Sequence, residues 1–315
     1  MSTRVHEAGH IARLIGRLET EHSEAVYAVM GASQRCPTEI QQLRCTSMSS
    51  FTSQLAEISC RLENFSSTAA VAESLLYVAM ATDDAVSKLR TESAVWDKLS
   101  QKSRHFLRSV RPLHALATVN ESAYVISGDY STVVDELTLL LPVPSRDVTL
   151  PRQLLCVDCE TALFASVSGV STIVSAQRAV GIQCALGHVF LRCGRLAAAE
   201  RFYFLSNWSR MESRLNDASY YFRDSTSYRL YAGAVECPRR VFAAMSALVA
   251  QSTGCTTTDD VSRWYSACKE MLGGTDRVME SLIVRTDKTV AEARQRCVLE
   301  IVVYTVLICI QVCLV

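Results

Sequence analysis

The stretch MSSFTSQLAEISCRLENFSSTAAVAESLLYVAMATDDAV (48–86) decides the fold of this 315-residue chain. Apolar side chains recur in it at alternating steps of three and four residues, with a polar Asp83 near the end. They are Met48, Phe51, Leu55, Ile58, Leu62, Phe65, Ala69, Ala72, Leu76, Ala79 and Val86. A 3.5-residue repeat held for about five heptads is typical of a long helix that packs as a coiled coil. The stretch therefore predicts a helical rod.

Proline indicates where the helices before and after this rod begin and end. A first helix is expected over about residues 5–30, and Pro37 breaks the chain after it. The next proline is Pro112, so nothing in between forces a break. A further helix is expected over about residues 86–110, with Leu89, Trp96, Leu99 and Phe106 on its apolar face.

A cluster of three prolines predicts a domain boundary at 142–151. Pro142, Pro144 and Pro151 stand close together, and proline inside a helix costs about 3 kcal/mol. We expect an N-terminal helical rod or coiled coil over 1–141, a helical hairpin domain over 152–296 and an apolar C-terminal tail over 297–315. Within the first part, Ser-Gly-Asp at 127–129 predicts a turn between two helices.

The second half reads as short paired helices. In ALGHVFLRCGRLAAAERFYFL (185–205), Gly194 separates two helical patterns and can supply the positive φ of a turn. The segment resembles one tetratricopeptide unit, although no second copy follows at the spacing of about 34 residues that such repeats have. Gly273 and Gly274 predict a turn after a helix over 264–272. The expected fold is all-α, with long N-terminal helices followed by stacked, α-solenoid-like hairpins.

Composition excludes several classes of function. With 32 basic and 32 acidic residues, the formal net charge is zero, which argues against a nucleic-acid-binding protein. No phosphate-binding glycine motif and no G-x-S-x-G nucleophile motif occurs. We expect no enzyme activity, no cofactor and no metal. The 13 cysteines are scattered along the chain, and we interpret them as reduced, cytosolic and mostly small core residues.

One motif indicates an alternative, a zinc site near the start of the chain. His6, Glu7 and His10 form the pattern H-E-x-x-H, which on a helix puts two imidazoles one turn apart where they can bind Zn²⁺. A third ligand cannot be assigned from the sequence. The other interpretation is the polar face of a terminal helix, with both histidines in solvent.

The last fifteen residues, IVVYTVLICIQVCLV (301–315), carry no charge. As a helix they would rise only about 22 Å, which is short of a hydrocarbon core of about 30 Å. Three interpretations stay open: a short tail anchor, a buried final element, or the truncated end of a longer protein.

Several features follow one another in a characteristic order in the first half. They are, in order, Leu14, Leu18, Glu19, Ile40, Leu43, the heptad rod, AVSKL (85–89), ESAVWDKL (92–99), LATVNES (116–122), Asp129 and Tyr130. With the hairpin at 188–210, this order covers about residues 10 to 210, and it resembles a known family, subunit 7 of the conserved oligomeric Golgi complex. Family members are considerably longer and begin with an acidic, aromatic stretch that this chain lacks, so the resemblance implies the front part of a longer tether.

The resemblance implies a non-catalytic subunit of a vesicle-tethering complex in intra-Golgi retrograde transport. It places the protein on the cytosolic face of the Golgi membrane, with other helical subunits, SNAREs and Rab proteins as partners. Its membrane association would be peripheral or through a short C-terminal anchor. From the heptad seam we expect partner binding by Phe51, Leu55, Ile58, Leu62 and Phe65, unless these pack within the chain against the 5–30 helix. The alternatives are a tetratricopeptide-like adaptor of another trafficking complex and a zinc hydrolase using residues 6–10.

Overall fold

The computed structural model describes residues 2–32, 68–112, 123–141, 157–221, 225–251 and 258–314. Throughout these ranges the regular structure is helical, and the helices pack against one another. They are α1 (Ser2–Ala32), α3 (Thr68–Glu92), α4 (Val95–Lys98), α5 (Gln101–His105), the π-helical segment η1 (Phe106–Val110), α7 (Ala123–Leu140), α8 (Val157–Cys193), α9 (Ala198–Tyr221), α10 (Ser225–Ala250) and α11 (Thr258–Leu314). The predicted all-α fold is confirmed.

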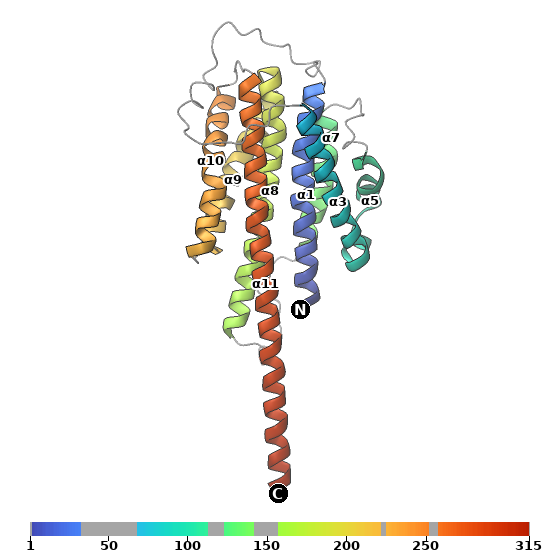
Figure 1. Ribbon diagram of the computed structural model, residues 1–315, viewed down its shortest axis with the longest axis vertical. Helices are drawn as coiled ribbons and strands as arrows, with labels where there is room; N and C mark the ends of the chain where they lie inside the picture. Colours follow the sequence, from blue (N-terminus) through green and yellow to red (C-terminus); the bar gives the residue numbers. More distant parts are fainter. Residues whose placement is uncertain are drawn as a thin grey trace.

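The long helices run side by side along one axis (Figure 1). Helices α8, α9, α10 and α11 form a ring in which each packs against the next, and α1 lies against both α8 and α11. On its other side α1 contacts α3 and α7. A single hydrophobic core extends from Ile11 to Ile283. Helices from both sides of the predicted boundary therefore share this core, and the boundary segment 142–151 itself lies outside the described residues.

Helix α1 is the centre of the packing. The predicted helix over 5–30 is confirmed, and its apolar residues Ile11, Leu14, Ile15 and Leu18 have no exposed surface. Their spacing of three and four residues puts them on one face of a helix, as the sequence indicates. Because α1 has neighbours on several sides, some of its polar residues are buried as well.

The heptad rod can be compared with the structure only from Thr68 onward. The predicted partner-binding residues Phe51, Leu55, Ile58, Leu62 and Phe65 lie outside the described residues. In α3, the predicted seam residue Leu76 is 53% exposed, so that part of the prediction is wrong. Ala79 is buried as predicted, and the other buried residues of the face that packs on α1 are Leu75, Thr82 and Leu89. The 3.5-residue period holds, but its register is shifted by one residue at Leu75.

The hairpin predicted at 185–205 is confirmed, with much longer helices than expected. Helix α8 has 37 residues and α9 has 24. Gly194 follows α8 with φ of 77°, a backbone conformation that side chains with a Cβ rarely adopt. Its N–H donates to the carbonyl of Phe190 at 2.7 Å and closes the end of the helix.

Two predicted turns are wrong, because the packing of their neighbours outweighs the low helix propensity of glycine. Residues 127–129 lie inside α7, where the flanking Ile126 and Tyr130 are fully buried. Residues 273–274 lie inside α11, between buried Leu272 and Thr275. Glycine in a helix costs about 1 kcal/mol, which the burial of such neighbours offsets.

The helix predicted over 86–110 is broken into shorter pieces. Leu89, Trp96, Leu99 and Phe106 are buried as expected, but α3 ends at Glu92 and α5 begins after Ser100. The Ser100 hydroxyl accepts a hydrogen bond from the Ser103 N–H at 3.1 Å, and Ser100 also donates to Glu136 of α7. A side-chain cap and a tertiary partner therefore stabilise a new helix start at this point.

Helix α11 continues well beyond the bundle, past the level of the N-terminal end of α1 (Figure 1). Thr286 is the last residue of α11 whose side chain is described as buried. Among the residues that the structure describes, none of the helices combines the length and apolar content needed to cross a lipid bilayer.

Candidate functional sites

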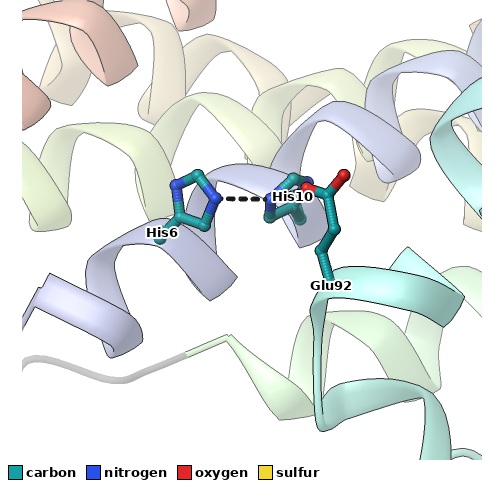
Figure 2. Close-up of side chains that lie close together, drawn as sticks. All are labelled: His6, His10 and Glu92. Carbon is teal, nitrogen blue, oxygen red and sulfur yellow. Dashed lines mark hydrogen bonds and ion pairs between the residues drawn. The ribbon is translucent and has the colours of Figure 1, made fainter. Parts of the chain in front are cut away.

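The H-E-x-x-H motif lies near the start of α1, and the fold brings a carboxylate to it. His6 and His10 are one helical turn apart, and Glu92, the last residue of α3, lies beside them (Figure 2). The Nε2 atoms of the two histidines are 3.0 Å apart, and His10 Nε2 is 3.5 Å from Glu92 Oε2. One ligand atom from each residue falls within 4.8 Å of the others, so the three can hold a metal ion.

Burial and charge favour the neutral form of His10. His10 is only 8% exposed, whereas His6 and Glu92 are exposed. Burial lowers the pKa of His10, the neighbouring His6 lowers it further, and the Glu92 carboxylate opposes both. The interpretation that both histidines face solvent is therefore wrong for His10. Sequence reasoning missed Glu92, because only the packing of α3 on α1 brings it here.

Arg13 and Lys88, whose charges act on His10, have acidic partners of their own. Arg13 donates to both carboxylate oxygens of Glu280, at 2.8 and 3.2 Å. Lys88 pairs with Asp84 at 2.8 Å. The ion-pair contact of Glu92 at this site is with His10.

A second polar cluster is buried against α1 and is built on Glu21. Arg111 Nη1 donates to both oxygens of this carboxylate, at 3.1 and 2.9 Å, and the Tyr130 hydroxyl donates to it at 2.7 Å. Arg111 also pairs with Asp83. Burial alone would lower the pKa of Arg111, but the carboxylates of Glu21 and Asp83 together have the larger effect and raise this pKa. This cluster links α1, α3 and α7, and no motif in the sequence predicts it.

Further along α1, Glu24 is buried at the contact with α3 and α11. It accepts hydrogen bonds from the Tyr265 hydroxyl at 2.5 Å and from Ser74 at 3.1 Å, and Lys269 donates to Ser74 at 2.9 Å. Burial raises the pKa of Glu24, and the hydrogen bond from Tyr265 opposes this rise. Hydrogen bonds thus hold the carboxylate in the core, as buried polar groups require.

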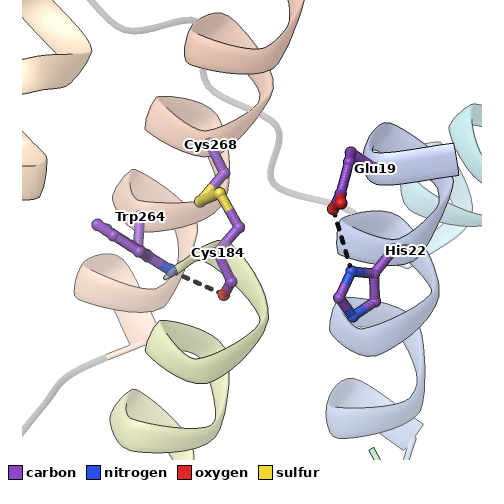
Figure 3. The surroundings of a disulfide bond; sticks show 5 residues. All are labelled: Glu19, His22, Cys184, Trp264 and Cys268. Carbon is purple, nitrogen blue, oxygen red and sulfur yellow. Dashed lines mark hydrogen bonds and ion pairs between the residues drawn. A yellow bond between two sulfur atoms is a disulfide. The ribbon is translucent and has the colours of Figure 1, made fainter. Parts of the chain in front are cut away.

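A disulfide bond joins the two longest helices. Cys184 of α8 and Cys268 of α11 are bonded, with their Cα atoms 5.7 Å apart (Figure 3). Beside them the Trp264 Nε1–H donates to the Cys184 carbonyl at 3.3 Å. Cys193 and Cys237 are also disulfide-bonded. The prediction of reduced cysteines is wrong for these four residues. In the case of Cys184 and Cys268, the packing of α8 on α11 brings together thiols that are far apart in the sequence.

His188 of α8 is a buried imidazole without a hydrogen-bond partner among the described residues. Neither ring nitrogen is satisfied, and the ring packs edge-on against Tyr27 with centroids 4.9 Å apart. Burial lowers the pKa of His188 to about 3, with a smaller contribution from His22. The unfolded chain has a histidine pKa of about 6.5. Between these values the unfolded state binds a proton that the folded state does not, so stability falls with falling pH.

Replacing His188 with Leu should flatten the pH dependence of stability. As the pH falls from 7 to 5, the buried His188 is expected to lower the free energy of unfolding by about 2 kcal/mol. Above pH 6.5 this loss is absent, because the histidine is then neutral in the unfolded chain as well. Glu19, Glu24 and Asp276, whose pKa values burial raises, act in the opposite direction but are common to both proteins. Urea unfolding at several pH values measures the difference. The exposed His105→Leu variant should keep the wild-type slope, and an unchanged slope in His188→Leu would refute the assignment.

The described part of the chain also carries an exposed apolar segment, Val298–Ile310 of α11. Its large apolar side chains are between 49% and 66% exposed. They are Val298, Leu299, Ile301, Val302, Val303, Tyr304, Val306, Leu307, Ile308 and Ile310. The apolar character of this tail is visible in the sequence, whereas partner binding was predicted for the heptad seam.

No family model, no curated protein and no solved structure matches this chain.

Proposed function

We propose that the protein is a non-catalytic helical assembly subunit whose segment 298–310 of α11 packs against helices of other chains. The observation that supports this most directly is the exposure of the segment on every side. A helix that packs on one neighbour needs only one apolar stripe. A helix that is apolar on all sides is normally buried among several neighbours. The free chain leaves each of these side chains about half exposed.

Polar groups within the segment favour protein helices over lipid as the partner. Glu300 lies among the apolar residues and is exposed, and a carboxylate inside hydrocarbon is costly. At the rim of a helix bundle the same carboxylate can remain in water. The Thr305 hydroxyl already donates to the Ile301 carbonyl at 2.7 Å, so it needs no partner of its own.

Aspartate substitutions on two faces of the segment test this proposal. We expect Ile301→Asp/Ile308→Asp and Leu299→Asp/Val303→Asp each to weaken association at least about 100-fold, because burying two such side chains contributes about 3 kcal/mol or more. The measurement is the mass of the tagged complex from its native cells by light scattering, with its subunits identified by mass spectrometry. Leu139→Asp, at a site on α7 that is 84% exposed, is the matched control and should assemble normally.

Two results would contradict the assembly proposal. One is wild-type protein that is monomeric and brings down no other helical chain. The other is wild-type protein that floats with protein-free lipid vesicles while both double variants do not, which would make lipid the partner.

The narrower proposal is a vesicle tether in intra-Golgi transport, on the cytosolic face of the Golgi, with SNAREs and Rab proteins as further partners. It rests on the residue order over about 10 to 210. The Cys184–Cys268 disulfide weighs against a cytosolic placement, because that compartment keeps most thiols reduced.

The alternative of a tetratricopeptide-like adaptor rests on the α8–α9 hairpin. Here α8, α9, α10 and α11 close into a ring, however, whereas repeat arrays stack in an open row.

A further inference from the structure

We propose that His6, His10 and Glu92 bind one zinc ion, which fastens the first turns of α1 to the end of α3. The site is independent of the assembly proposed above, because all three ligands belong to one chain. It completes the H-E-x-x-H motif with a carboxylate that the sequence alone could not assign.

The separations between the ligand atoms suit a tetrahedral ion. Zinc lies about 2.0–2.1 Å from nitrogen and oxygen ligands, which puts two ligands of a tetrahedron about 3.3 Å apart. The observed separations from His10 Nε2 are 3.0 Å to His6 Nε2 and 3.5 Å to Glu92 Oε2. Small side-chain rotations of the exposed His6 and Glu92 would bring the three atoms around one point (Figure 2).

The chemistry of the three groups also suits zinc. Two imidazoles and one carboxylate form a donor set that Zn²⁺ uses in proteins, whereas Mg²⁺ and Ca²⁺ prefer oxygen ligands. Without an ion, the two Nε2 atoms at 3.0 Å must share one proton between them. An ion gives both lone pairs a common partner and the Glu92 carboxylate a countercharge. Since His6 and Glu92 are exposed, water can take the fourth position.

Zinc at this point would change how α1 and α3 are held together. Helix α3 ends at Glu92, and His10 is the buried member on α1. A metal bond between them adds a direct link at the end of the α1–α3 contact. Zinc binding should therefore raise the melting temperature of the folded chain, since an ion that binds only the folded state stabilises it.

Calorimetric titration of the tag-free, EDTA-treated full chain with Zn²⁺ tests the assignment. We expect one ion per chain, an upward shift of the melting temperature, and visible absorption bands of four-coordinate Co²⁺ when cobalt replaces zinc. His6→Ala and Glu92→Gln should each raise the Kd at least about tenfold and remove the cobalt bands. Both residues are exposed, so these variants should keep the melting temperature of the metal-free protein.

Matched variants separate this site from weak surface binding. His105→Ala and Asp97→Asn change an exposed histidine and an exposed carboxylate elsewhere and should bind Zn²⁺ like the wild type. Glu7→Gln should also bind normally, because Glu7 is not among the three ligands. Wild-type affinity in Glu92→Gln would overturn the proposal, as would loss of binding in Glu7→Gln or no binding by the wild type.

Discussion

Replacing Arg111 with Met is expected to lower the free energy of unfolding by about 3–5 kcal/mol, which makes it one of the two largest effects predicted for this protein. Arg111 is 1% exposed and donates to both oxygens of Glu21, which is itself fully buried. Met fills a similar volume, so the loss comes mainly from the uncompensated carboxylate that remains in the core. Chemical unfolding followed by circular dichroism measures it.

A double variant separates the charge effect from the loss of packing. Adding Glu21→Gln to Arg111→Met removes the buried charge and keeps an oxygen that can accept a hydrogen bond from the Tyr130 hydroxyl. We therefore expect this double variant to recover about 2 kcal/mol or more of the loss. Arg90→Met, at an exposed position of α3, is the control and should change stability by less than about 0.5 kcal/mol. The ion-pair account fails if Arg111→Met is no more destabilised than Arg90→Met.

The helices that could be predicted are those whose apolar residues follow a helical period. Ile11, Leu14 and Leu18 predicted α1 because their spacing alone defines a buried face. Gly194 predicted the α8–α9 hairpin because its backbone conformation is accessible mainly to glycine. Where a local signal competes with packing, as at Gly128 inside α7, tertiary contacts decide and the sequence misleads.

The sites could be predicted only where all their residues lie on one helix. The spacing of His6 and His10 is visible in the sequence, whereas Glu92 joins them through the contact of α1 with α3. Glu19 is a similar case. A Cβ on Gly181 of α8 would lie 1.8 Å from Glu19 Oε2, so this carboxylate depends on a glycine that is distant in the sequence. Such juxtapositions are set by the register between helices, which local periodicity does not encode.

Removing the Cys184–Cys268 disulfide is the other prediction with a large expected effect. We expect Cys184→Ala/Cys268→Ala to lower the free energy of unfolding by about 4–5 kcal/mol. The bond spans 84 residues of sequence, so its loss returns substantial chain entropy to the unfolded state. Alanine avoids burying a free thiol or a hydroxyl at these two core positions. Guanidinium unfolding of both proteins measures the difference.

Dithiothreitol gives an independent test of the same bond. It should destabilise the wild type by more than it destabilises the double variant, because only the wild type holds the Cys184–Cys268 bond. The double variant accounts for Cys193 and Cys237, which are also disulfide-bonded and are reduced in both proteins. Cys309→Ala removes an exposed free thiol and should leave stability unchanged. Equal effects of the reductant on wild type and double variant would show that this bond contributes nothing.

Whether Cys184 and Cys268 are bonded in cells indicates the compartment in which the protein acts. Quenching cells in acid, then denaturing the protein and alkylating its free thiols, shows whether Cys184 and Cys268 are bonded there, because denaturation exposes buried thiols to the reagent. We expect both to stay unlabelled, because their helices pack directly and hold their Cα atoms 5.7 Å apart. A bonded pair indicates an oxidising compartment, and the cytosolic Golgi tether would then fail while helical assembly through α11 would still hold. If both thiols are labelled, the bundle must be stable without the bond, and the stability measured in reductant is the one that applies in the cell.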